Sequence, residues 1–204
     1  MNNDSVNTAK EINLFPTAVW IFPPPSPQRV DLKAAQDAAM RLYTNNSVSP
    51  APNKSARHAW RLDSPHEREE FRASFNYIAE LLNQTAKRLK LETGPREFDS
   101  WLQFLEPGGY HVLHQHSPNI LSGILYLSDC SDSAKLVLRD PRAARHCSPE
   151  SQSGPIEVPV ASSFGSAIIF PGWLEHWVEE NESDSYLTYI SFNLGRRKTE
   201  PGSH

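Results

Sequence analysis

The stretch from Trp101 to Asp129 constrains the fold more than any other part of this chain. Residues 101–106 alternate between two sets of side chains, which is the period of a β-strand. Residues 107–109, Pro-Gly-Gly, are expected to break that strand. Residues 120–127 are mostly apolar and predict a second strand. The sequence therefore predicts strand, turn and strand, with the motif His-Gln-His at residues 114–116 between them.

Three histidines in this part of the chain have the pattern of a metal site. His114 and His116 are separated by one residue, and His176 follows much later in a Pro-Gly turn. Residues two apart on an extended backbone point to the same face, so both imidazoles could bind one metal ion. A histidine from another strand completes the layout of a mononuclear site in a small β-barrel. His111 would face the other side of a regular strand and is interpreted as a rim residue.

Length, charge and cysteine content limit the class of protein. The 204 residues suit one domain, 1–204, with a polar tail at 1–10 and a core large enough to be stable. A net charge of −4 gives no sign of binding to nucleic acid or to an acidic membrane. Two cysteines, Cys130 and Cys147, cannot form a disulfide framework, so a reducing, cytoplasmic location is expected. No apolar run reaches the roughly 20 residues that a membrane helix needs.

The first half of the chain predicts helices. Residues 12–22 are a strand candidate interrupted by proline, and residues 57–61 a short strand. Asp31 is a candidate N-cap for a helix from Leu32 to about Thr44. A second helix, from Pro65 to roughly Leu91, has apolar residues at helical spacing. These helices are interpreted as packing on a sheet.

The second half predicts short strands and turns, and loops that border the site. Segments 45–55 and 143–154 are polar and are interpreted as loops that determine specificity. Helices followed by many short strands predict an α+β domain, a sandwich or barrel backed by helices. The remaining strand candidates are residues 135–138, 156–160, 167–170 and 186–194.

Five motifs occur in order along residues 12–194 and together resemble one enzyme family. They are Leu14–Thr17, His114–His116 with Leu121–Leu127, Asp140–Arg142, Gly165–His176 and Ile190–Asn193. This order is similar to the 2-oxoglutarate/Fe(II)-dependent oxygenase superfamily, and in particular to a bacterial subgroup with an H-x-H motif.

The resemblance implies a double-stranded β-helix, or jelly-roll, core at residues 98–194, backed by the N-terminal helices. It also implies an enzyme that uses Fe(II), 2-oxoglutarate and dioxygen to hydroxylate a C–H bond of a small-molecule or amino-acid-like substrate, releasing succinate and carbon dioxide. His114, His116 and His176 would then bind the metal at the catalytic centre. Iron oxygenases commonly use two histidines and one carboxylate, and here His116 stands at the carboxylate position.

The chain departs from this family at Leu187, where an arginine usually pairs with the distal carboxylate of 2-oxoglutarate. Leucine cannot bind a carboxylate, and burying an unpaired carboxylate is costly. Arg142, in the Asp-Pro-Arg motif, and Arg139 are the candidate substitutes, because a guanidinium grips a carboxylate at two points. Polar groups that could assist are Tyr126, Thr188, Tyr189 and Asn193.

Two other functions stay open at this point. A three-histidine iron dioxygenase that binds its substrate directly would need no 2-oxoglutarate, and Leu187 would then be explained. A jelly-roll without catalytic activity could instead bind a small molecule or a partner, with the histidines structural or holding zinc. The sequence leaves the substrate and the oligomeric state open.

Overall fold

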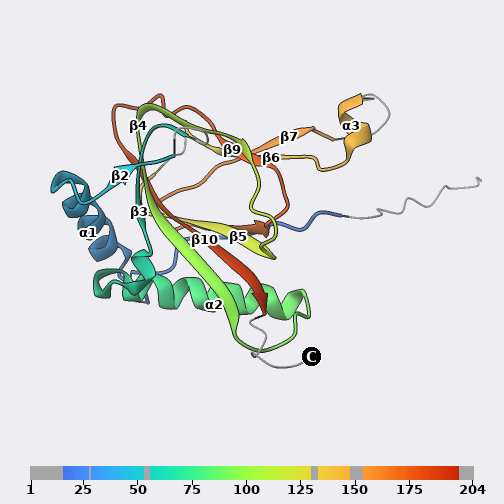
Figure 1. Ribbon diagram of the computed structural model, residues 1–204, viewed down its shortest axis with the longest axis horizontal. Helices are drawn as coiled ribbons and strands as arrows, with labels where there is room; N and C mark the ends of the chain where they lie inside the picture. The colour runs from blue at the N-terminus through green and yellow to red at the C-terminus, as the bar shows by residue number, and fades with distance from the viewer. Residues whose placement is uncertain (1–15, 28, 53–55, 130–132, 148–153, 198–204) are drawn as a thin grey trace, which may run out of the picture.

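The computed structural model describes residues 16–27, 29–52, 56–129, 133–147 and 154–197. A curved antiparallel sheet folds over on itself, and the two longer helices lie along one side of it (Figure 1). The strands are β1 (Trp20–Phe22), β2 (Ser49–Pro50), β3 (Ala56–Asp63), β4 (Arg96–His114), β5 (Leu121–Tyr126), β6 (Leu136–Arg139), β7 (Glu157–Val160), β8 (Ala167–Pro171), β9 (His176–Val178) and β10 (Leu187–Arg197). The helices are α1 (Leu32–Thr44), α2 (Arg72–Arg88) and α3 (Ala143–Cys147).

The strand order defines two layers that share one long strand. Hydrogen-bonded neighbours follow the order β1-β8-β5-β10-β4-β9-β6-β7, and β3 pairs with β4 and with β2. The first half of β4 pairs with β10, in the larger layer. The second half of β4 pairs with β9, in the smaller layer. This arrangement is the double-stranded β-helix, so the predicted jelly-roll core is confirmed.

An outer core joins the helices to the larger layer. Helix α1 begins as predicted, with the Asp31 carboxylate accepting from the Ala34 backbone N–H at 3.1 Å. In Figure 1, α2 runs beneath the crossing strands β4 and β10. The apolar face of α2 packs on alternate residues of the strands, because successive strand residues point to opposite faces. Buried members of this core include Ile78, Leu81, Leu102, Phe104, Leu125, Ile169, Ile190 and Phe192.

An inner core fills the space between the two layers. The residues that alternate with the outer set point into it from both layers. These residues include Leu105, Ile124, Tyr126, Ile168, Phe170, Leu187 and Tyr189 from the larger layer, and Leu136, Leu138, Val160 and Val178 from the smaller one. The molecule therefore has two apolar cores, and polar side chains within the inner core need an explanation.

The strand expected to break at residues 107–109 continues through them. β4 runs from Arg96 to His114, and Gly108 adopts a φ of +77°, which a residue with a side chain rarely tolerates. A Cβ on Gly109 would lie 2.7 Å from the His58 carbonyl oxygen. These glycines therefore bend one strand from the first layer into the second.

Three further elements differ from the sequence prediction. Residues 65–71 form two 3₁₀ turns separated by the extended Arg68, so α2 begins only at Arg72. Residues 143–147, expected as loop, form α3, where the buried Arg145 lies 3.5 Å from the Asp140 carboxylate. β2 occupies part of the loop predicted at 45–55.

The remaining predicted strands appear with small shifts at their ends. Of the first strand candidate, only residues 20–22 are β-structure, and residues 12–15 lie outside the described part of the chain. Within the described residues, no helix has the length and apolar character needed to cross a membrane. Cys147 is an exposed thiol, and Cys130 lies outside the described residues.

Candidate metal centre

His114, His116 and His176 meet at one end of the inner core. One ring nitrogen from each lies within 4.8 Å of those of the other two. The ring centroids of His114 and His176 are 4.4 Å apart, and that of His116 is 5.1 Å from each. Three imidazole nitrogens at this spacing could ligate one metal ion, and imidazole suits iron as well as zinc, copper and nickel.

Strand pairing places two of the three histidines. His114 is the last residue of β4 and His176 the first of β9, and their Cα atoms are partners across the antiparallel pair. His116 lies two residues beyond the end of β4, not on an extended strand as the sequence analysis assumed. Its backbone N–H donates to the Gly172 carbonyl at 2.7 Å, which fixes the loop beside the turn before β9.

Each histidine has one ring nitrogen engaged. His114 Nδ1 lies 2.7 Å from the Val112 carbonyl oxygen, and His176 Nδ1 lies 2.8 Å from that of Leu174. A carbonyl oxygen only accepts, so these Nδ1 atoms carry the proton and the lone pair is at Nε2. His116 forms its side-chain hydrogen bond with Asn193. The three rings are thus oriented without a bound ion.

The electrostatic environment keeps the cluster neutral. Burial, and then the neighbouring His114, lowers the pKa of His116 to about 4 and that of His176 to about 3. Burial also lowers the pKa of His114, although the hydrogen bond to Val112 opposes this. Neutral imidazole is the form that binds metal, so the site is ready to bind near pH 7.

Trp101 and Asn193 support the His116 ring. The Trp101 and His116 rings are parallel, with an angle of 3° and centroids 5.6 Å apart. With its amide oriented to satisfy both neighbours, Gln103 accepts from Trp101 Nε1 at 2.9 Å. Asn193 is itself fixed, because its oxygen accepts from Ser122 Oγ at 2.6 Å and its nitrogen donates to Asp99 at 3.1 Å. Asn193, predicted to contact a ligand, therefore contacts His116.

The histidines open into a cavity of about 310 Å³ between the two layers. Its wall combines polar groups near the histidines with apolar and aromatic residues of the inner core. The other lining residues are Arg61, Asp99, Trp101, Gln103, His111, Ser122, Gly123, Ile124, Phe170, Val178, Tyr189 and Ser191.

His111 faces this cavity, and its interpretation as a rim residue is wrong. The pairing of β4 with β9 shifts register between His111 and His114. A bulge at this place turns both side chains to the same face, although they are three residues apart. His111 is 7% exposed, and its ring lies 6.3 Å from those of His114 and Tyr189.

Tyr126 and Thr188 lie on opposite faces of the larger layer. Tyr126 is in the inner core, with its ring 5.9 Å from that of Tyr189, which lines the cavity. Thr188 precedes Tyr189 and points the other way, and its backbone N–H donates to Ser128 Oγ at 2.8 Å. Of the two, Tyr126 is the one beside the cavity wall.

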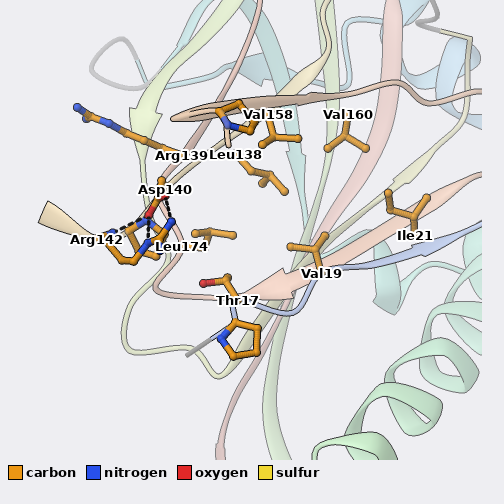
Figure 2. Close-up of a pocket in the computed structure, with 13 residues that line it drawn as sticks. Thr17, Val19, Ile21, Leu138, Arg139, Asp140, Arg142, Val158, Val160 and Leu174 are labelled. Carbon is orange, nitrogen blue, oxygen red and sulfur yellow. Dashed lines mark hydrogen bonds and ion pairs between the residues drawn. The ribbon is translucent and has the colours of Figure 1, made fainter. Parts of the chain in front are cut away.

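Arg139 and Arg142 do not line the histidine cavity. They border a separate groove of about 470 Å³ between β1 and β7, shown in Figure 2. Arg142 holds Asp140 at two points, with Nε–Oδ1 at 3.0 Å and the second pair at 2.6 Å. Asp140 therefore orients this segment, and the paired Arg142 holds its pKa down to about 2. Arg139 lies 3.7 Å from the Glu175 carboxylate.

Leu187 is 3% exposed within the inner core, among apolar neighbours. Among the described residues that line the histidine cavity, Arg61 is the one lysine or arginine. Arg61 was not among the candidate site residues, and its place in the predicted strand 57–61 is the one signal of it in the sequence. Arg61 points inward because β3 pairs with β4 in a register that aligns Arg61 with Gln103.

Fold and site together define a class: a double-stranded β-helix protein with a three-histidine cluster suited to a metal ion, beside a cavity. Residues 99–193 match the family described as "Putative 2OG-Fe(II) oxygenase". The match spans the jelly-roll core, just under half of the chain, and together with the shared fold and the histidine cluster it supports a 2-oxoglutarate-dependent oxygenase whose cofactors are Fe(II) and 2-oxoglutarate.

Solved structures share the fold over most of the chain. A prolyl-4-hydroxylase of Pseudomonas putida matches with a TM-score of 0.66 and 17% identity, covering 89% of this chain and 94% of that one. The epimerase SnoN, with Fe³⁺, α-ketoglutarate and nogalamycin RO, matches with a TM-score of 0.68 and 12% identity, covering 92% and 87%. HygX of Streptomyces hygroscopicus, with nickel and 2-oxoglutarate, matches with a TM-score of 0.59 and 11% identity, covering 88% of this chain and 83% of that one. No curated protein matches the sequence.

Proposed function

We propose that this oxygenase hydroxylates a C–H bond of a small-molecule or amino-acid-like substrate, with His114, His116 and His176 as its iron ligands. The observation that carries the proposal is the convergence of three ring nitrogens within 4.8 Å at the mouth of a cavity. The Nε2 lone pairs of His114 and His176 fit a metal, because Nδ1 of each ring already contacts a backbone carbonyl. A three-histidine set carries no negative charge, so the bound unit is one charge more positive than with a carboxylate ligand.

The chain's own residues would bind the metal, hold its ligands in place and shield the reacting atoms from water. Bound iron, with 2-oxoglutarate and dioxygen, supplies the oxidising chemistry, in which one oxygen atom enters the C–H bond and the other enters succinate as carbon dioxide leaves. Phe170, Val178 and Ile124 line the cavity and keep water from the reacting atoms. Trp101 and Asn193 hold the His116 ring in place.

The groove of Figure 2 supports a small-molecule substrate with an apolar part. Val19, just before β1, and Ile21 of β1 face Val158 and Val160 of β7 across it, and Leu138 forms part of its wall. Leu138 is the strand partner of His176, so this wall adjoins the proposed metal centre. Ligand pockets typically combine such apolar walls with a few polar groups.

One observation favours a second candidate within the same class of chemistry. Leu187 is buried among apolar residues, so the family's usual partner for the distal carboxylate is absent from that position. A three-histidine iron dioxygenase that binds its substrate directly would need no such partner. The requirement for 2-oxoglutarate separates the two candidates.

The test is an anaerobic titration of metal-free protein with Fe(II) and then with 2-oxoglutarate. The proposal expects the visible iron-to-keto-acid charge-transfer band to appear and saturate, and His116→Ala to abolish iron binding. Iron binding without a band would favour the direct-binding dioxygenase. Full activity of His116→Ala would remove His116 from the site, and a tight zinc site without turnover would indicate a non-catalytic binding protein.

We further propose that residues 1–204 form one domain and that the protein works in a reducing compartment such as the cytoplasm. The continuous sheet over residues 20–197 supports the first point. The low cysteine content supports the second. Limited proteolysis, which would release a stable fragment from a two-domain chain, tests the first.

A further inference from the structure

We propose that Arg61 of β3 pairs with the distal carboxylate of 2-oxoglutarate and so takes the role that Leu187 cannot fill. The inference rests on the proposed function, because it concerns how the same cavity selects its cosubstrate. It assigns the role to a strand that precedes the jelly-roll core.

The two arginines expected from the sequence, Arg142 and Arg139, pair with other side chains outside the histidine cavity. Arg142 is bound at two points to Asp140, whose side chain is only 9% exposed. Both residues border the groove of Figure 2, which we call the outer groove. Arg139 lies beside Glu175 and within 3.4 Å of His146. Breaking this bidentate pair would leave the nearly buried Asp140 carboxylate with only the more distant Arg145, at 3.5 Å, which is unfavourable.

Arg61 is placed in the histidine cavity and is only loosely held. Its side chain is 31% exposed, and its ion-pair partner Asp63 is 71% exposed. An exposed pair of this kind contributes only about 0–1 kcal/mol, so a carboxylate entering the cavity can replace Asp63. The guanidinium carbon lies 4.6 Å from the centre of the Trp101 ring. This cation–π contact orients the group before a ligand binds, which lowers the entropy lost on binding.

Charge in the cavity favours this assignment over a neutral contact. Asp99 also lines the cavity, but Asn193 donates to it at 3.1 Å at the side of His116. Ser191, Tyr189 and Gln103 are neutral. Arg61 is thus the one cationic side chain among the described residues that line the cavity, and its guanidinium can bind a carboxylate bidentately.

The assignment predicts selectivity for the distal carboxylate rather than for the keto-acid end. The probes are 2-oxoglutarate and 2-oxopentanoate, in which a methyl group replaces the distal carboxylate. The variants are Arg61→Gln, Arg61→Lys and, as the matched control in the outer groove, Arg142→Gln. Anaerobic titration with Fe(II) present gives the dissociation constant of each acid from the charge-transfer band, and Fe(II) affinity and thermal unfolding report on the site and the fold.

The expected result is a loss of about 10- to 100-fold in 2-oxoglutarate affinity for Arg61→Gln, the value of a charge-assisted hydrogen bond. The affinity for 2-oxopentanoate and for Fe(II) should stay unchanged, Arg61→Lys should recover part of the loss, and Arg142→Gln should match the natural protein. The inference is overturned if the Arg61→Gln variant still prefers 2-oxoglutarate to 2-oxopentanoate. It is also overturned if the variant loses affinity for both acids equally.

A different result would show that the proposed function itself, the use of 2-oxoglutarate, is wrong. If Fe(II) binds to the natural protein but neither acid gives a band, the use of 2-oxoglutarate itself is overturned, and the role of Arg61 with it. If the natural protein prefers 2-oxoglutarate and only Arg142→Gln loses that preference, the function holds and the outer groove supplies the partner.

Discussion

The three histidines are oriented by two different means. His114 and His176 each face the carbonyl oxygen of the residue two positions earlier, Val112 or Leu174. Local backbone geometry is enough for this contact. His116 lies beyond the strand, so its ring depends on side chains from elsewhere, Trp101 and Asn193. We therefore expect His116 to be the ligand most sensitive to changes in neighbouring residues.

Replacing Asn193 tests this dependence. Asn193→Ala removes the hydrogen bond to the His116 ring, and we expect a fall of about 10- to 100-fold in Fe(II) affinity, the usual cost of losing a residue that orients a ligand. Competition titration with a chelating dye measures it. Ser122→Ala removes only one of the two contacts that fix Asn193 and leaves the contact of Asn193 with His116, so it should cause a smaller loss. Equal affinities for Asn193→Ala and the natural protein would contradict the orienting role.

The lowered pKa values predict an acid-tolerant site. Protons compete with metal only near the folded pKa, about 4 for His116 and about 3 for His176, rather than near the ordinary value of 6.5. Because the pKa of His114 is lowered as well, metal affinity should fall at a lower pH, between about 7 and about 4, than at ordinary histidines, which become protonated near pH 6.5. Co(II) titrations across this range measure it, and a fall centred near pH 6.5 would contradict the buried, neutral cluster.

The same shifts affect the stability of the metal-free protein. The unfolded state binds protons at about pH 6.5, whereas the folded state binds them only at lower pH, so the unfolded state holds more protons in between. The free energy of unfolding should therefore fall as the pH drops from 6.5 toward 4. Urea unfolding measures this slope, which should be shallower in His116→Ala.

At the scale of elements, the site is built where strands end and turns meet. β4 brings His114 to its end, and antiparallel pairing with β9 brings His176 opposite it. The turn at Gly172 then contacts the loop that carries His116. Its carbonyl accepts from the His116 N–H at 2.7 Å, and its N–H donates to the Ile120 carbonyl at 3.1 Å.

A substitution at Gly172 should disturb this junction. A Cβ there would lie 2.3 Å from the Asn119 carbonyl oxygen, so Gly172→Ala must push the turn and the loop apart. We expect a loss of about 1–3 kcal/mol in the free energy of unfolding and weaker metal binding, because His116 moves with the loop. Chemical unfolding and metal titration measure the two effects. Trp173→Ala, at an adjacent side chain that is 47% exposed, is the control and should leave metal binding unchanged.

At the scale of the whole molecule, the two apolar cores have separate roles. The outer core attaches α1 and α2 to the sheet, and the inner core surrounds the cavity. The histidines join strands of both layers of the sheet, since β4 and β9 meet where His116 reaches Asn193 of β10. A metal ion at this place would therefore tie the two layers together.

Metal binding should accordingly stabilise the entire fold. A ligand that binds only the folded state contributes about 2.7 kcal/mol at 100 times its dissociation constant. For a chain of this size, this corresponds to an increase of roughly 5–10 °C in Tm. Thermal unfolding with and without Fe(II) or Co(II) under anaerobic conditions measures it. A shift of the same size in His176→Ala would show that the ion binds elsewhere.

The sequence alone determined most of the elements and the three histidines. Alternation in residues 101–106, the apolar run at 120–127 and helical spacing in α2 are local patterns, and each depends only on the residues of one segment. The spacing of His114 and His116 and the Pro-Gly turn before His176 are likewise local features. These features sufficed to predict a jelly-roll core backed by helices, which the structure confirms, and to select the histidines that the structure brings together.

The tertiary structure decided which other side chains share the cavity. His111 depends on a bulge between β4 and β9, and Arg61 on the register of β3 against β4. Asn193 reaches His116 only because β10 lies between β4 and β5. A one-residue change in pairing would turn any of these side chains to the opposite face. Register between strands distant in sequence is set by the packing of the whole core, and no local pattern in the chain encodes it.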